Sequence, residues 1–166
     1  MAALWTAAYT DDPRGGRTTP YSANDFQLAL ANGEVLVAEV SQGIAGVVVL
    51  YDGGPRDGQV AEAGEFELSR LAVAEPCRRE GIGRLLAENC LRLASERGDS
   101  MLVLWSRPKQ TEAHRLYKSL GFTRLPDRDS KDSDGPRIVF ARSLEKLSES
   151  GGVPLPQRLK KSRWRP

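Results

Sequence analysis

The pattern of apolar and polar residues switches between strand-like and helix-like stretches along the chain. Strands are predicted where β-branched and apolar residues run together or alternate with polar ones. Residues 34–40 and 43–51 are two such runs, and the turn Ser41-Gln42-Gly43 between them predicts a β-hairpin. Further strands are predicted at 65–73, at 101–105, from Phe122 onward and at 137–144.

Helices are predicted where apolar residues recur every three or four positions. The two clearest patterns each end directly before a glycine, which is typical of a helix C-terminus, and they cover residues 82–97 and 110–120. Two shorter helices are expected, with Ser22 as the N-cap of the second, at 1–9 and 24–31.

The order of these elements predicts an α/β fold with a mixed central β-sheet flanked by helices. A hairpin comes first, followed by strand, helix, strand and helix and then by two closing strands, so both antiparallel and parallel pairs are expected. A polar loop is expected between the closing strands, at 126–136. In the strand 65–73, a period of two places one set of side chains on the same face: Glu65, Glu67, Ser69, Leu71 and Val73.

The composition indicates one globular domain. The 166 residues are 40% hydrophobic and 28% charged, which suffices for a core. We assign the domain to residues 1–147 and interpret 148–166 as a Pro/Gly/Ser-rich linker followed by a basic, flexible tail. The sequence contains neither a long apolar run nor a secretory signal, so we expect a cytoplasmic protein with no membrane partner.

The basic charge is concentrated at the C-terminus. The last nine residues, RLKKSRWRP, contain five Lys or Arg and no acid, although the net charge of the whole chain is only +2. Such a tail suits a nucleic-acid or acidic partner, but a solvated terminus is the interpretation we favour.

The cysteines and the histidine do not indicate a metal site. Cys77 and Cys90 stand thirteen positions apart, and the single histidine, His114, follows far downstream. This spacing supports neither a disulfide framework nor a zinc site. We therefore expect no metal.

The segment Arg-Arg-Glu-Gly-Ile-Gly at 78–83 predicts an anion site. It lies between a strand and a helix, so several backbone N–H groups and the helix dipole point the same way, with Arg78 and Arg79 beside them. The alternative is that the glycines serve only close packing. Gly83 is followed by Arg84, which excludes a Walker loop, and a third glycine of the dinucleotide fingerprint is missing.

Two motifs in order resemble a known family. LAVAEPCRREGIGRLL (71–86) resembles motif A of the GNAT superfamily of acyl-CoA N-acyltransferases, and AHRLYKSLGF (113–122) resembles its motif B. The resemblance covers roughly residues 22–144 and is closest to bacterial small-molecule N-acetyltransferases.

This chain departs from the family pattern at three places. Arg79 stands where members often have glycine, and the usual proline is displaced to Pro76. The first strand of the family is not evident before the helix 1–9, and the resulting sheet edge favours association, so a homodimer is a possible assembly.

The resemblance implies acetyl-CoA as co-substrate and a set of residues that bind it. Backbone groups near the end of the strand 65–73 would hold the pantetheine arm and polarise the acetyl carbonyl, while the glycine loop would hold the pyrophosphate. The residues implied are Leu71, Ala72, Val73, Arg78, Arg79, Gly81, Ile82, Gly83, Arg84 and, where relatives have an asparagine, Gln110.

The resemblance also implies two catalytic residues. Glu67 is the candidate general base for the acceptor amine, and Tyr117, the motif B tyrosine, is the candidate acid for the leaving thiolate. Glu67 can instead be a solvated cross-strand residue, with Glu65 as the substitute base, and Tyr117 can be a core residue. We interpret His114 as structural.

The acceptor is expected to be a small-molecule amine. Trp105 and Ser106 are candidates for contact with it, and four acids of the loop 126–136 can attract a cationic amine or merely be solvated: Asp127, Asp129, Asp132 and Asp134. The motifs do not select among acceptors. The alternative function is a non-catalytic acyl-CoA-binding regulatory module that acts through the basic tail.

Overall fold

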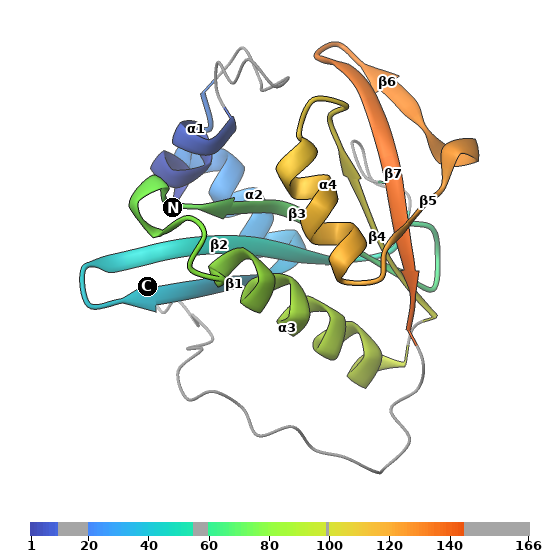
Figure 1. Cartoon of the computed structure of the whole chain (residues 1–166), viewed down its shortest axis with the longest axis horizontal. Coiled ribbons are helices and arrows are strands. Elements are labelled where there is room, and N and C mark those ends of the chain that lie inside the picture. The colour runs from blue at the N-terminus through green and yellow to red at the C-terminus, as the bar shows by residue number, and fades with distance from the viewer. Residues whose placement is uncertain (10–19, 55–59, 99, 145–166) are drawn as a thin grey trace.

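The computed structural model describes residues 1–9, 20–54, 60–98 and 100–144 (Figure 1). Within them, the strands form one central sheet in the order β1-β2-β3-β4-β7-β5, and β6 pairs with β7. Only β3 and β4 are parallel, so the mixed sheet is confirmed. The strands are β1 (Gly33–Val40), β2 (Gly43–Asp52), β3 (Glu65–Val73), β4 (Met101–Ser106), β5 (Thr123–Arg124), β6 (Ser130–Asp132) and β7 (Gly135–Ser143).

Helices cover both faces of this sheet. In Figure 1, α3 and α4 lie on one face, and α1 and α2 lie on the other. The helices are α1 (Ala2–Tyr9), α2 (Ala23–Asn32), α3 (Ile82–Arg97) and α4 (Thr111–Ser119), and the 3-10 turns are η1 (Glu75–Cys77) and η2 (Pro126–Arg128).

Local sequence signals set the ends of the helices. At the start of α2, Ser22 Oγ accepts a hydrogen bond from the backbone N–H of Asp25, whose carboxylate accepts one from the backbone N–H of Ser22. Gly81 and Gly98 bound α3 with φ values of 83° and 87°. Glycine adopts this left-handed conformation without a Cβ clash, so the helix predicted at 82–97 is observed with the same ends.

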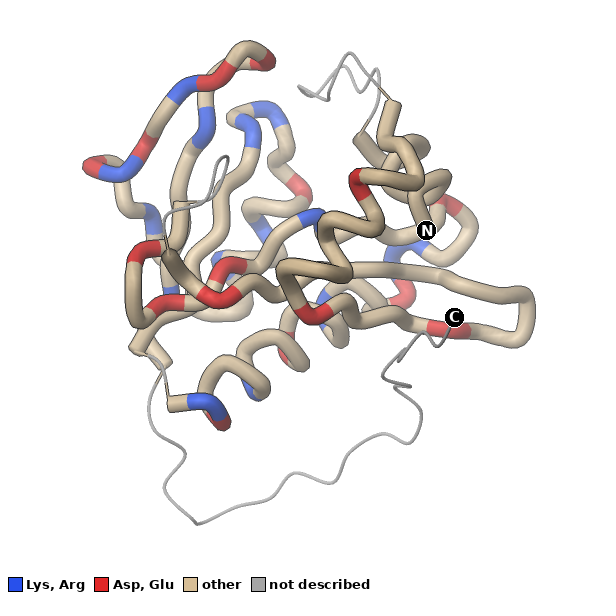
Figure 2. Tube along the Cα trace, turned by 180° about the vertical axis from the view of Figure 1, so that it is seen from behind, with Lys and Arg blue, Asp and Glu red and all other residues tan. Residues whose placement is uncertain are grey.

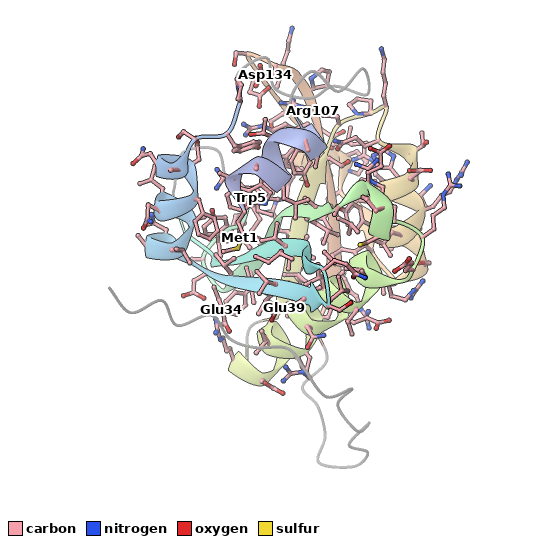
Figure 3. The ribbon with its side chains drawn as sticks, turned by 90° about the vertical axis from the view of Figure 1, so that its left-hand side faces the viewer. Met1, Trp5, Glu34, Glu39, Arg107 and Asp134 are labelled. Atoms are coloured by element: carbon pink, nitrogen blue, oxygen red, sulfur yellow. The ribbon has the colours of Figure 1, made fainter. Side chains whose placement is uncertain are left out.

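Two clusters of buried side chains join the helices to the sheet. The cluster below α3 and α4 includes Leu36, Val48, Leu50, Leu68, Leu86, Leu104, Tyr117 and Phe140. The cluster below α1 and α2 consists of Trp5, Ala29, Val35, Val47, Val49, Tyr51 and Ala72. Trp5 is 0% exposed and lies between α1 and the sheet (Figure 3).

A β-bulge interrupts the alternation of β3. Val49 pairs with Ser69, but Val47 pairs with Ala72, so β3 has an additional residue opposite β2. Arg70, inside this bulge, has a φ of 54°. Beyond the bulge the side chains change faces, and Leu71 packs on the α3 side whereas Ala72 packs on the α1 side.

The bulge corrects one sequence prediction. Glu67 lies opposite Tyr51 in the β2–β3 pairing, and Tyr51 packs below α1 and α2. Leu71 and Val73 face α3 instead, where Val73 lies beside Gly83. Glu67 therefore does not share a face with Leu71 and Val73, because an additional residue shifts the period of two.

The segment 126–136, expected as a polar loop, contains secondary structure. It forms η2 and β6, and β6 pairs with the beginning of β7. Because the side chains of this segment are polar, its sequence shows no pattern that predicts a strand. None of the described helices is long and apolar enough to cross a membrane. The predicted linker and tail, 148–166, lie outside the described residues.

Candidate functional site

Strands β3 and β4 separate in the middle of the sheet. They pair only where residues 65–67 meet residues 101–103. Beyond this point, in the described part of the chain, β3 pairs with β2 and β4 pairs with β7. In the second half of β3, the backbone groups on the β4 side are therefore not paired with β4.

Helix α1 holds the bulge of β3 in place. Trp5 Nε1 donates a hydrogen bond to the carbonyl oxygen of Arg70 at 3.1 Å, and the hydroxyl of Tyr9 donates one to the carbonyl oxygen of Leu71. No local pattern predicts either contact, because α1 and β3 are far apart along the chain. α1 thus positions the segment that resembles the pantetheine-binding part of the family.

Glu67 is a buried carboxyl at the point where the strands separate. It is 1% exposed, and its Oε2 accepts hydrogen bonds from the backbone N–H groups of Val60 (2.6 Å) and Ala61 (3.2 Å). Burial raises its pKa to about 7, although these hydrogen bonds and the charges of Arg137 and Arg70 act in the opposite direction. A carboxyl that titrates near neutral pH can both accept and release a proton.

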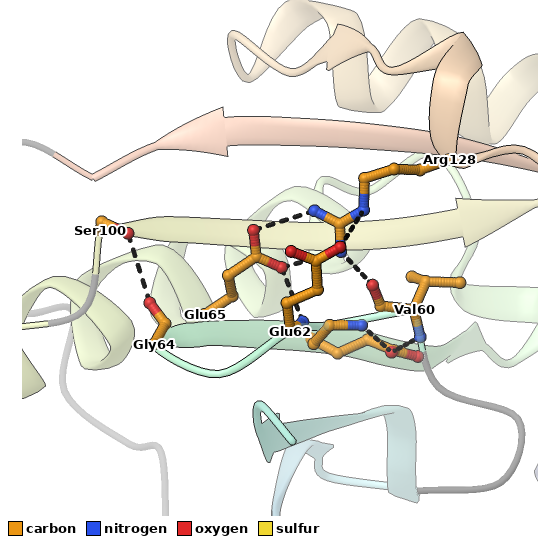
Figure 4. Close-up of polar contacts among 8 residues, drawn as sticks. Val60, Glu62, Gly64, Glu65, Ser100 and Arg128 are labelled. Atoms are coloured by element: carbon orange, nitrogen blue, oxygen red, sulfur yellow. Dashed lines mark hydrogen bonds and ion pairs between the residues drawn. The ribbon is translucent and has the colours of Figure 1, made fainter. Parts of the chain in front are cut away.

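Glu65, the substitute base, is in a different environment (Figure 4). Arg128 donates from Nη1 and Nη2 to its two oxygens, each at 2.9 Å, and the backbone N–H of Glu62 donates to Oε2 at 2.9 Å. Burial opposes its ionisation, but the hydrogen bonds and the charge of Arg128 prevail and lower its pKa. Glu65 therefore remains charged and bound to Arg128.

The turn before α3 presents an exposed basic surface. Arg79 has a φ of 66°, and its side chain is 91% exposed and lies 3.8 Å from Glu112. Arg78 is also exposed, and its Nε donates to the carbonyl oxygen of Val73 at 3.3 Å. Because α3 begins here, its first amides and two exposed guanidinium groups belong to the same turn, an arrangement that suits an anion.

The other residues predicted at this turn contact neighbouring parts of the protein and are less available to a ligand. Arg84 donates to Ser119 at 2.7 Å and lies 3.4 Å from Glu88. Ile82 packs against the core below α3. A Cβ on Gly83 would lie 3.6 Å from the side chains of Val73 and Leu116, so this glycine lies close to both β3 and α4.

Tyr117 is a buried residue of α4. Its ring packs against Phe122 and Phe140, with centroids 5.9 and 6.0 Å away. Burial is the main cause that raises its pKa, and the nearby Cys90 adds to the shift, so the hydroxyl stays protonated at neutral pH. Tyr117 and Glu67 lie on opposite faces of the sheet.

Gln110 and His114 belong to a hydrogen-bonded turn between β4 and α4. The Gln110 side-chain oxygen accepts from Ser106 Oγ (2.8 Å) and from the backbone N–H of Arg107 (3.1 Å). His114 Nε2 lies 3.0 Å from the carbonyl oxygen of Arg107, to which it donates, and burial lowers its pKa. These contacts explain His114 structurally; a contact of Gln110 with the cofactor stays a prediction.

Sequence reasoning missed a cluster around Trp105. The guanidinium groups of Arg107 and Arg137 lie 4.9 and 4.6 Å from its ring, and both bind the carboxylate of Asp132. Arg107 is only 5% exposed. The cluster requires β7 to pair with β4 and β6 to pair with β7, and no local pattern indicates that.

The acids of 126–136 are not a uniform attractive surface. Asp132 is paired with Arg107 and Arg137, and Asp129 with Arg124. In Figure 2, acidic and basic residues follow one another along this hairpin. Only Asp127 and Asp134 among the four are exposed without a salt bridge in the described part of the chain.

Comparisons with known proteins identify a family and related folds. The sequence model described as "Acetyltransferase (GNAT) family" matches residues 2–122. N-acetyltransferase family 8 member 3 of Rattus norvegicus is 32% identical over 112 residues, which are 68% of this chain but 43% of the rat protein. The chain thus spans less than half the length of that relative.

Solved structures share the fold. The ribosomal-protein-alanine N-acetyltransferase of Brucella melitensis has a TM-score of 0.71 at 22% identity, covering 86% of this chain and 91% of its own. An acetyltransferase of Bacillus subtilis in complex with CoA has a TM-score of 0.60 at 20% identity, covering 75% and 85%.

Proposed function

The chain belongs to the GNAT family of acetyltransferases, and from this premise we propose that it transfers the acetyl group of acetyl-CoA to a primary amine by direct attack. The observation that carries the proposal is Glu67, a carboxyl that is 1% exposed, has a pKa raised to about 7 and lies where β3 and β4 separate. A group with this pKa is suited to proton transfer at neutral pH.

We assign the pyrophosphate of acetyl-CoA to the beginning of α3. The first amides of a helix and the positive end of its dipole favour a phosphate, and the exposed guanidinium groups of Arg78 and Arg79 add charge and directed donors. The Bacillus subtilis neighbour was solved in complex with CoA, which supports CoA as a ligand of this fold. The bound thioester then extends along the half of β3 that has separated from β4.

Glu67 is assigned to the acceptor amine. An amine with a pKa near 10.4 is almost wholly protonated at pH 7, so a proton must leave before or during attack. Both hydrogen bonds that Glu67 accepts in the described part of the chain go to Oε2. We therefore assign Oε1 to the proton, which it accepts directly or through a water molecule.

The remaining steps fall to β3 and α4. As the N–C bond forms, the thioester oxygen gains negative charge, and backbone groups of Leu71, Ala72 and Val73 are assigned to the pantetheine arm and to this oxygen. The C–S bond then breaks, and Tyr117 gives its proton to the sulfur and recovers one from solvent. Acceptor and thioester would thus meet between the strands from opposite faces of the sheet.

A turnover assay tests the proposal. We expect the wild type to release CoA from acetyl-CoA in the presence of amines, with kcat/KM rising with pH through about 7. Glu67→Gln should lower turnover by about 10²- to 10⁴-fold. Glu96→Gln, which removes an acid from the exposed side of α3, is the matched control and should leave turnover unchanged.

Two results would contradict the proposal. Full activity of Glu67→Gln would remove the assigned base. Binding of acetyl-CoA by the wild type without transfer to any amine would favour the non-catalytic acyl-CoA-binding module instead.

A further inference from the structure

Arg70 is a half-buried cation held by aromatic residues. Its guanidinium carbon lies 5.2 Å from the ring centroid of Trp5 and 5.6 Å from that of Tyr21, and its Nη1 donates a hydrogen bond to the hydroxyl of Tyr51 at 3.1 Å. Its backbone is in the bulge of β3, with a φ of 54°. An arginine side chain is thus fixed at a position where its own backbone is strained.

Arg70 differs from four other buried or half-buried arginines. Arg107, Arg124, Arg128 and Arg137 each form a salt bridge with an Asp or Glu. Arg70 forms none in the described part of the chain, where its polar contact is a neutral phenol. A half-buried guanidinium without a carboxylate among the described residues has donors left for an anion that those residues do not supply.

This cation is close to the candidate base. Tyr51, which binds Arg70, is the cross-strand partner of Glu67. Directly opposite residues of an antiparallel pair project from the same face, with Cβ atoms about 4.5 to 5.5 Å apart. The charge of Arg70 also acts on Glu67, whose pKa it lowers. The guanidinium and the carboxyl therefore line the same side of the sheet.

We propose that Arg70 binds a carboxylate of the acceptor, and that the acceptor is therefore a free α-amino acid whose amino group faces Glu67. The inference rests on the proposed function. In an α-amino acid, one carbon atom joins the amine to the carboxylate, which matches a base and a cation that line the same side of the sheet. Trp5 and Tyr21 hold the guanidinium in place, so its donors are oriented before the acceptor arrives.

Paired acceptors test the inference. We would measure kcat/KM with L-alanine, L-phenylalanine and L-lysine, and with the amide of each, which keeps the α-amine but lacks the carboxylate. The wild type should prefer the free amino acid by about 10- to 100-fold, the usual worth of a hydrogen-bonded charge pair. The α-amine of an amide has the lower pKa and is more often neutral, so this comparison is biased against the inference.

Variants assign the preference to Arg70. Arg70→Asn removes the guanidinium, and asparagine tolerates the left-handed backbone better than most residues; it should reduce the preference to near unity while leaving the amides nearly unaffected. Tyr51→Phe, which keeps the ring but frees Nη1, is the second variant and should reduce the preference less. Arg92→Gln, on α3, is the control and should keep it.

The outcomes distinguish a failure of this inference from a failure of the proposed function. Transfer to amides or to an N-terminal alanine peptide as fast as to free amino acids would overturn the inference and leave the proposed function standing. An unchanged preference in Arg70→Asn would also overturn it. No transfer to any acceptor, with no binding of acetyl-CoA, would overturn both.

Discussion

Two carboxyl groups on β3 have pKa values that are shifted in opposite directions, because their neighbours differ. Glu65 and Glu67 are 8% and 1% exposed. Glu65 binds the cation Arg128, and its pKa is lowered despite burial. Glu67 accepts hydrogen bonds from neutral amides, and burial raises its pKa to about 7. The pair shows how one residue type serves as a fixed charge and as a candidate base on the same strand.

The raised pKa of Glu67 predicts a pH-dependent stability. The unfolded chain releases this proton near 4.5 and the folded state near 7, so the contribution of Glu67 is present below 4.5 and lost as the pH rises through 7. This loss lowers the free energy of unfolding by about 3 kcal/mol. In Glu67→Gln an amide oxygen can still accept from Val60 and Ala61, so above pH 7 the variant should be more stable than the wild type by about this amount.

Urea unfolding between pH 4 and pH 9 measures the effect. The difference in the free energy of unfolding between the two proteins isolates Glu67 from the other titrating groups. Stability curves that run parallel over this range would show that Glu67 titrates normally.

Arg79 combines a strained backbone with an exposed charge. Its φ of 66° costs a residue with a Cβ about 1 kcal/mol relative to glycine. Arg79→Gly should therefore stabilise the fold by up to this amount and weaken CoA binding a few-fold, since a cation is lost. Arg78→Gly is the matched control, because its φ of −70° offers no strain to relieve.

Thermal unfolding and CoA titration measure both effects in the same two variants. Tighter CoA binding by Arg79→Gly would mean that the arginine obstructs the site instead of completing it.

At the scale of elements, η2 holds the segment that supports Glu67. Arg128 donates to the carbonyl oxygen of Val60 and to both oxygens of Glu65, while the N–H of Val60 donates to Glu67 (Figure 4). The segment 60–65 thus lies between Arg128 and the candidate base. Movement of η2 would alter the hydrogen bonds on that base.

Removing Arg128 should change both stability and the pH profile. Arg128→Met leaves Glu65 buried without its partner, which costs about 3 kcal/mol. It also removes a positive charge near Glu67 and loosens its donors, so the apparent pKa in kcat/KM should rise above that of the wild type.

The double variant Arg128→Met with Glu65→Gln separates these effects. It should recover much of the stability, because the uncompensated charge is gone, but it should keep the shifted pH profile. Recovery of both would show that Arg128 acts on Glu67 only through overall stability.

At the scale of the molecule, ligand binding should stabilise the fold as one unit. Acetyl-CoA or CoA at 100 times its Kd should add about 2.7 kcal/mol, which corresponds to a rise in Tm of several degrees, at about 2 to 4 °C per kcal/mol. NADH and ATP are the ligand controls and should not raise the Tm. Glu67→Gln is the variant control, and acetyl-CoA should raise its Tm as much as that of the wild type. No shift with acetyl-CoA would contradict the site at the start of α3.

The sequence by itself determined the mixed sheet, the glycine turn before α3 and the order of the elements other than η1, η2 and β6. Each signal lies within a few consecutive residues: the apolar period of 82–97, the glycines at its ends and Ser22 as the N-cap of α2. The two family motifs are equally local, so they indicated the family and the candidate Tyr117. Glu67 lies outside both motifs, and its place on the strand 65–73 together with the family resemblance indicated it.

Only the tertiary structure decided the environment of those candidates. The bulge at Arg70 depends on pairing with β2 and is held by Trp5, 65 positions away, and Arg128 binds Glu65 across 63 positions. Burial and charge come from residues that meet only in the folded chain. The pKa of a carboxyl depends on both, so no local pattern distinguishes the ion-paired Glu65 from the titratable Glu67.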